Sequence, residues 1–153
     1  MSGKVFVATA GMGAKVRAPA LVAKDVGAVD VVVFSAPQLS LVEMQAVAGL
    51  LDGKRVAVPL LAVTSPQVKA DVDRFGLTTR IEASGATVLS GMCFYQSYAR
   101  EMAEANNWRR LATNSAKLVN ILGGYGYKPV LLSMQQCVEA ACAGGKLVAR
   151  TQS

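Results

Sequence analysis

The chain has 153 residues, of which 52% are hydrophobic and 17% are charged, and its net charge is +6. A chain of this length and composition can bury one hydrophobic core and carries too little charge to be disordered. Its 16 basic residues are scattered and form no block with interleaved aromatic rings, so we expect no nucleic-acid partner. The positive charge suits an anionic small molecule, or solubility alone.

The sequence also argues against a membrane protein, a secreted protein and histidine-based catalysis. Its most apolar stretch, 51–66, is interrupted by Lys54, Arg55 and two prolines, so we expect no membrane span. The first eleven residues contain no long apolar run of the kind found in secretory signals, so we expect a cytoplasmic protein. There is no histidine, which excludes Ser-His or Cys-His catalysis from within this chain.

The first half of the chain alternates apolar strands with helical segments. The run "VDVVVFSA" is nearly continuously apolar, which is typical of a strand buried on both faces. In the strand at 54–63, Pro59 indicates a sheet edge or a bulge, because proline has no N–H to donate. The predicted strands of this half are 4–10, 29–36 and 54–63, and the predicted helices are 40–53 and 65–85 with a break at Gly76.

Cap residues define where two of these helices begin. Ser40 is followed three residues later by Glu43, which predicts a capping box, and Gly53 supplies a C-terminal stop. Ser65 followed by Pro66 predicts an N-cap with proline at the first helical position. The two helix starts are therefore predicted from local chemistry alone.

The second half of the chain continues the same alternation. The predicted elements are a strand at 86–91, a helix at 95–108, a strand at 109–114, a helix beginning at 115, a strand at 128–133 and a helix at 134–145. This order predicts an α/β fold, a single three-layer domain with a mainly parallel sheet flanked by helices. We expect that domain to span 1–146 and to be followed by a mobile tail at 147–153.

In a parallel sheet, ligands bind at the carboxyl ends of the strands. Four loops are predicted to meet there, namely "SAPQLS", "AVTSP", "GMCFYQS" and "TNSAK". The "TNSAK" segment opens a helix, whose N–H groups suit a phosphate or carboxylate, and Lys117 adds a cation. The alternative is an ordinary N-cap followed by a lysine that faces solvent.

The three cysteines do not form a recognisable metal motif. Cys93 follows a predicted strand, while Cys137 and Cys142 lie in the last helix. Residues five apart on a helix are separated by about 140°, so Cys137 and Cys142 are poorly placed to bind one metal ion together. Each cysteine could equally be a small buried hydrophobic residue.

The order of these segments resembles one known family. The stretches "SAPQLSLVEMQAVAGLLDGKRVAVPLLAVTSPQV", "IEASGATVLSGMCFY", "TNSAKLVNILGG" and "CVEAA" are similar to the C-terminal part of the aconitase X catalytic subunit. The similarity covers roughly 28–145 in the same order. It implies an iron–sulfur hydro-lyase, a dehydratase that acts on a small hydroxy acid. Substrates known in the family include cis-3-hydroxy-L-proline and mevalonate 5-phosphate.

The resemblance also implies roles for particular residues. Cys93 and Cys137 match family cysteines, which implies that they ligate a [2Fe–2S] or [4Fe–4S] cluster, either within this chain or together with a partner chain. The implied substrate-binding residues are Thr64, Ser65, Asn114, Ser115 and Lys117. The catalytic base is not implied by any matched residue.

Some positions depart from the family pattern. Family members often have a histidine after the proline of "SAPQLS", and some have a cysteine before it, whereas this chain has Ala36 and Gln38. The family subunit is also longer, which implies partners: an N-terminal catalytic part and a small swivelling subunit. Three interpretations stay open: a subunit of a heteromeric hydro-lyase, a non-catalytic or regulatory relative that binds an anion or a protein, and an unrelated α/β domain.

Overall fold

A computed structural model describes residues 27–96 and 99–147. These residues form a five-stranded parallel sheet in the order β3-β2-β1-β4-β5. The strands are β1 (Val31–Leu39), β2 (Leu60–Thr64), β3 (Thr87–Ser90), β4 (Arg110–Thr113) and β5 (Lys128–Leu131). The predicted α/β class and the parallel sheet are therefore confirmed.

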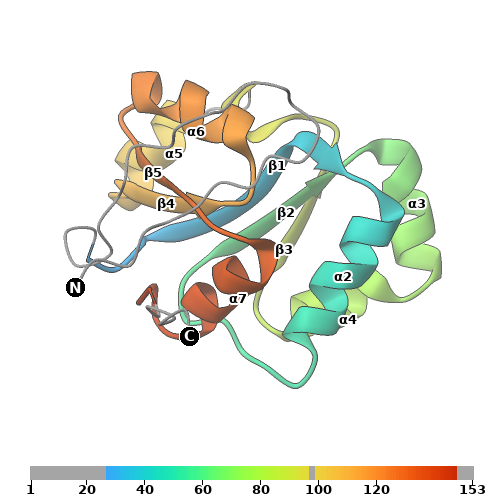
Figure 1. Ribbon diagram of the computed structural model, residues 1–153. Coiled ribbons are helices and arrows are strands. Elements are labelled where there is room, and N and C mark those ends of the chain that lie inside the picture. The colour runs from blue at the N-terminus through green and yellow to red at the C-terminus, as the bar shows by residue number, and fades with distance from the viewer. Residues whose placement is uncertain (1–26, 97–98, 148–153) are drawn as a thin grey trace.

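Six helices and two short 3₁₀ turns connect the described strands. They are α2 (Leu41–Leu51), α3 (Pro66–Arg74), α4 (Leu77–Ala83), α5 (Ala99–Asn106), α6 (Ala116–Leu122), α7 (Met134–Cys142), η1 (Phe94–Gln96) and η2 (Gly123–Tyr125). Figure 1 shows α5 and α6 above the sheet and α2, α4 and α7 below it. The predicted strand at 4–10, and residues 148–153 of the predicted tail, lie outside the described residues, so the domain limits stay a prediction.

The central strand β1 is buried on both faces, as its apolar run predicted. Val32 and Phe34 pack into the core between the sheet and α2, α4 and α7. Val31 and Val33 pack into the second core, between the sheet and α5 and α6. All four side chains are fully buried. This alternation follows from the two-residue period of a strand, and it places β1 at the centre of both hydrophobic layers.

The predicted helix caps are confirmed. The Ser40 hydroxyl accepts from the Glu43 N–H at 3.2 Å, and the Glu43 carboxylate accepts from the Ser40 N–H at 3.1 Å. Ser65 caps α3 with Pro66 at the first helical position. Gly76 has φ +73° and separates α3 from α4, where sequence analysis placed the break.

The prediction that Pro59 indicates a sheet edge or bulge is wrong. The strand begins at Leu60, directly after the proline, and pairs with both β1 and β3. The Pro59 carbonyl nevertheless accepts from the Val32 N–H at 2.9 Å. Proline therefore precedes an interior strand here, where its missing N–H removes no hydrogen bond from the ladder.

The helix predicted at 95–108 is shorter in the structure. A 3₁₀ turn occupies Phe94–Gln96, and α5 runs over Ala99–Asn106. The helix ends before Asn107, whose φ of +56° lies outside the helical region. No helix in the described part of the chain is long and apolar enough to cross a membrane.

Candidate functional site

The order of the strands places a topological switch point between β1 and β4. From β1 the chain passes through α2 to β2 on one side, and from β4 it passes through α6 to β5 on the other. The two connecting helices cover opposite faces of the sheet. The loops that leave the carboxyl ends of β1 and β4 therefore turn toward opposite faces of the sheet. In doubly wound sheets generally, small molecules bind where two such loops diverge.

An irregular segment follows β1 at this edge of the sheet. The pairing of β1 with β2 shifts register between Phe34 and Leu39. Within it Ala36 has φ +56° and is joined to Pro37 by a cis peptide bond. The Ser35 hydroxyl accepts from the Phe94 N–H at 3.0 Å, which holds the loop after β3 beside β1.

Ser115 connects the loops on the two sides of the switch point by hydrogen bonds. Its buried hydroxyl donates to the Ala36 carbonyl and accepts from the Leu118 N–H at 3.2 Å, which caps α6. The Ser115 N–H donates to the Thr113 hydroxyl at 3.2 Å. One side chain therefore joins the loop after β4 to the loop after β1.

Thr64 and Ser65 fix the end of β2 in a similar way. The Thr64 hydroxyl is fully buried and donates to the Leu39 carbonyl. The Ser65 hydroxyl accepts from the Val68 N–H at 3.1 Å as the cap of α3. Both hydroxyls predicted to bind substrate therefore make hydrogen bonds within the fold.

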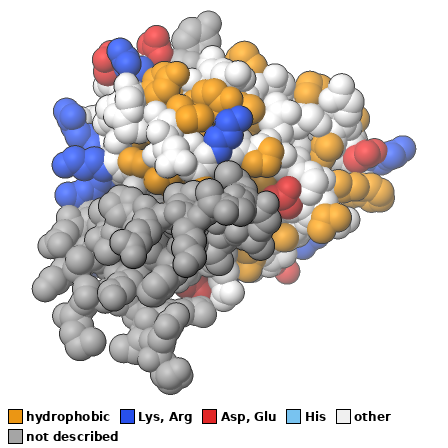
Figure 2. Space-filling model, turned by 45° about the horizontal axis from the view of Figure 1, so that its top comes forward, with side chains coloured by type: hydrophobic (Ala, Val, Ile, Leu, Met, Phe, Trp, Pro, Cys, Tyr) orange, Lys and Arg blue, Asp and Glu red, His pale blue; other side chains and the backbone are white. Residues whose placement is uncertain are grey.

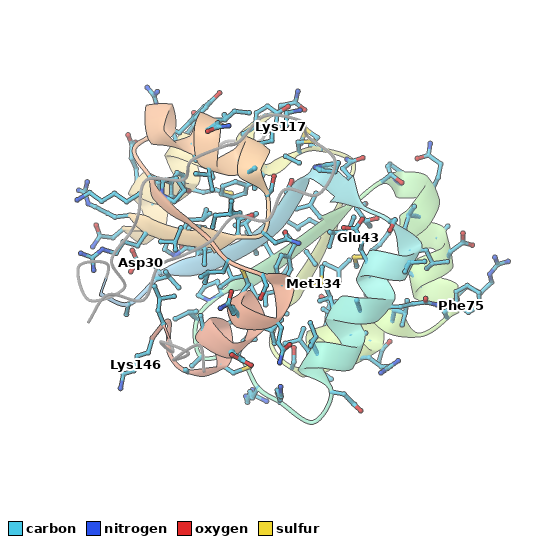
Figure 3. The ribbon with its side chains drawn as sticks, viewed as in Figure 1. Asp30, Glu43, Phe75, Lys117, Met134 and Lys146 are labelled. Atoms are coloured by element: carbon cyan, nitrogen blue, oxygen red, sulfur yellow. The ribbon has the colours of Figure 1, made fainter. Side chains whose placement is uncertain are left out.

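Lys117 is the predicted substrate residue that faces solvent. Its ammonium lies 5.4 Å from the centre of the Tyr95 ring, at a distance typical of a cation–π contact. Figure 3 shows Lys117 at the upper border of the molecule, above the sheet. Asn114 is half-buried between β4 and α6. Lys117 is thus the predicted substrate residue best exposed to a ligand, whereas Asn114 and Ser65 are half-buried.

The four loops predicted to converge do meet at one edge, because hydrogen bonds join each to a neighbour. Sequence analysis missed two residues that build this edge, Ser35 and Tyr95. Ser35 could have been noticed as a polar residue near the end of the predicted strand 29–36, and Tyr95 as an aromatic residue in the loop that follows the strand 86–91. Their partners, Phe94 and Lys117, lie far away in the sequence and could not be assigned from it.

The two cysteines predicted to ligate a cluster lie in different surroundings. Cys93 is half-buried, just before η1. Cys137 is fully buried in the core beneath α2, α4 and α7, and burial raises the pKa of its thiol well above the ordinary value. The half-buried Cys142 also has a raised pKa, through desolvation, against which the charge of Lys54 acts.

The described residues on their own do not fit an iron–sulfur cluster. Among them, no three histidine, cysteine, aspartate or glutamate side chains lie together in a way that could hold a metal ion. A cluster ligand must be a thiolate, and Cys137 is held in its neutral form by its apolar surroundings. Any such cluster would need ligands from outside the described part of the chain.

The fold and this edge together define a doubly wound α/β domain with a candidate small-molecule site at its switch point. The family model "Aconitase X third domain" matches residues 29–143. The chain therefore belongs to the aconitase X family, as the resemblance of its segments predicted.

Two relatives give the scale of this match. The phosphomevalonate dehydratase large subunit of Methanocaldococcus jannaschii is 33% identical over 88 residues, which are 58% of this chain and 21% of that subunit. The holo-form crystal structure of Thermococcus kodakaraensis aconitase X has a TM-score of 0.66 and 29% identity, over 74% of this chain and 28% of that one. The chain thus corresponds to about a quarter of these longer proteins.

Proposed function

We propose that this chain is the third-domain part of an aconitase X-like dehydratase, a hydro-lyase of the cytoplasm that acts on a small hydroxy acid. The observation that carries the proposal is the family match over 29–143. The relatives are several times longer, so the rest of the enzyme would come from further domains or from partner subunits. The name of the curated relative, a large subunit, supports a small-subunit partner.

In this proposal Lys117 and Asn114 recognise the carboxylate or phosphate of the substrate. Lys117 is exposed at the carboxyl ends of the strands, and its contact with Tyr95 restricts where its charge lies. An ammonium so placed can bind an anion without deforming the sheet. Lys117 is therefore proposed to bind and orient substrate.

Thr64, Ser65 and Ser115 have a different role in the proposal. Their hydroxyls make hydrogen bonds to backbone groups of the surrounding loops and helices. We assign them the task of holding the loops of the candidate site in place. A hydroxyl that turned to bind substrate would leave its backbone partner unsatisfied, a carbonyl for Thr64 and Ser115 and the Val68 N–H for Ser65. They are positioning residues that act through the backbone they fix.

An iron–sulfur cluster enters the proposal only as a group completed by other parts of the enzyme. Cys93 is the stronger candidate ligand, because it is half-buried and follows β3 at the carboxyl edge. Ala36, where some family members have a cysteine, belongs to the segment that Phe94 contacts through Ser35. No reaction step is assigned to the cluster here.

The second candidate function is a non-catalytic relative that keeps the fold. Ala36 and Gln38 favour it, because neither can act as a metal ligand of the usual kind or as a general base. Such a protein would bind an anion or a partner at the same edge and would turn over no substrate. The two candidates differ in iron content and in assembly.

Native mass spectrometry of protein purified without oxygen separates them. Partner chains, with an iron–sulfur mass increment that Cys93→Ala removes, support the dehydratase. A bare chain or homo-oligomer without iron refutes it and leaves the non-catalytic relative.

The role of Lys117 is tested in the assembled enzyme. Lys117→Ala should raise KM about tenfold or more, the effect of losing one charge-assisted hydrogen bond. The matched control is Lys146→Ala, an exposed lysine that follows α7 on the far side of the molecule (Figure 3). Equal KM values for the two variants would contradict the assignment.

A further inference from the structure

A hollow lies at the opposite end of the sheet from the candidate site. It has a volume of about 470 Å³ and is bounded by the end of α5, the loop that leads into β4, and η2. Since β4 and β5 begin just beyond these segments, the hollow is at the amino ends of the strands. Its volume is in the range typical of small-molecule sites. The side chains that matter are those of Arg100, Trp108, Arg109 and Tyr125.

One wall is fixed by Arg100. Its guanidinium donates to the Gly124 carbonyl at 3.0 Å and lies 5.7 Å from the centre of the Tyr125 ring. These contacts join α5 to η2 and hold the planar guanidinium at the hollow. A guanidinium has five N–H donors, so further donors remain to bind an anion.

The opposite wall is fixed through the backbone. The Trp108 N–H donates to the Ala103 carbonyl at 2.9 Å, which turns the chain back after α5. The Arg109 N–H donates to the Asp30 carboxylate at 2.8 Å, while its side chain is exposed. The hollow is therefore formed by anchored segments and does not depend on a ligand for its shape.

The lining combines positive charge with flat rings. The lining contains two guanidinium groups, those of Arg100 and Arg109, and one carboxylate, that of Glu104. In Figure 2 basic side chains gather at the left border, the side on which β4 and β5 begin in Figure 1. Trp108 and Tyr125 are half-buried, so part of each ring is accessible. Guanidinium forks bind carboxylates and phosphates in a bidentate manner, and aromatic rings accept a flat partner.

We propose that this hollow binds a small aromatic anion, a flat ring that carries a carboxylate or a phosphate. The anion would pair with Arg100 and Arg109 while the ring packs against Trp108 and Tyr125. This site is separate from the candidate site at the switch point, and the proposal does not depend on the proposed dehydratase function.

The chain contains a single tryptophan, so its fluorescence reports on this hollow directly. We would titrate the full chain with phenyl phosphate and phenylacetate, each of which carries both a ring and an anion. Inorganic phosphate, which has only the anion, and benzyl alcohol, which has only the ring, are the comparison probes. The expected result is a saturable change in Trp108 emission, with binding at least about tenfold tighter for one ring–anion probe than for either half, as expected when a charge-assisted contact adds to ring packing. The phosphate and carboxylate probes tell the two anion sources apart. Equal or absent binding of all four compounds overturns the proposal.

Arginine variants provide the second test. Arg109→Ala removes an exposed side chain and keeps the N–H that contacts Asp30, so the variant should fold and should bind the better probe at least about tenfold more weakly. Arg80→Ala, an exposed arginine of α4 beneath the other face of the sheet, is the matched control and should bind as the unchanged protein does. If both variants bind alike, the assignment of the anion to this hollow is wrong.

Discussion

Ser115 offers the sharpest test of how the candidate site is built. The Ser115→Ala substitution removes one oxygen atom that performs two tasks: it caps α6 through the Leu118 N–H, and it donates to the Ala36 carbonyl across the switch point. Ser65→Ala is a matched control, because the Ser65 hydroxyl caps α3 through the Val68 N–H. The comparison isolates the hydrogen bond between the two loops.

The expected magnitude follows from these contacts. Loss of a serine N-cap costs about 1 kcal/mol of unfolding free energy. A buried carbonyl that loses its donor costs about 1–3 kcal/mol more. We therefore expect Ser115→Ala to lower the unfolding free energy by about 2–4 kcal/mol and Ser65→Ala by about 1 kcal/mol. In a domain of this size each kcal/mol lowers Tm by about 2–4 °C.

Urea unfolding followed by circular dichroism measures both values. The slope of the unfolding free energy against urea should be the same in both variants, so that the midpoints report stability alone. If Ser115→Ala loses no more stability than Ser65→Ala, the hydrogen bond to Ala36 adds nothing to the fold. The Ser115 hydroxyl would then be available to a ligand, and its assignment as a positioning residue would be wrong.

Two further predictions concern the far end of the domain and the buried thiol. Gly145 has φ +86°, and a Cβ there would overlap the Val29 carbonyl, so Gly145→Ala should lower the free energy of unfolding by on the order of 3 kcal/mol. Gly144 has φ +70° and open space around it, so Gly144→Ala should lower it by about 1 kcal/mol. Urea unfolding measures both values. Equal losses would show that the close approach to Val29 is unimportant. Burial raises the pKa of the Cys137 thiol. Above about pH 9 the unfolded chain therefore loses the thiol proton while the folded chain keeps it. The free energy of unfolding should then fall with rising pH by up to about 1.4 kcal/mol per pH unit. Cys137→Ala should reduce that slope between about pH 9 and 11, and an unchanged slope would rule out this thiol as its source.

Local chemistry in the sequence was sufficient for most of the described secondary structure. The capping box of Ser40 and Glu43 and the Ser65–Pro66 start act within one helical turn, so they are visible without any tertiary contact. Pro59 was misjudged because its missing N–H restricts a strand only if the strand includes it, and here the strand begins one residue later.

Tertiary structure decided what the polar residues of the candidate site do. The sequence placed Thr64 and Ser115 after strands, which is where a substrate could be bound. Their hydroxyl partners, the carbonyls of Leu39 and Ala36, lie 25 and 79 residues away, and such pairs form only when the sheet is assembled. The hollow around Trp108 likewise joins α5 to η2. A short-range pattern can predict where a side chain lies along the chain, but the strand order decides which backbone group it meets.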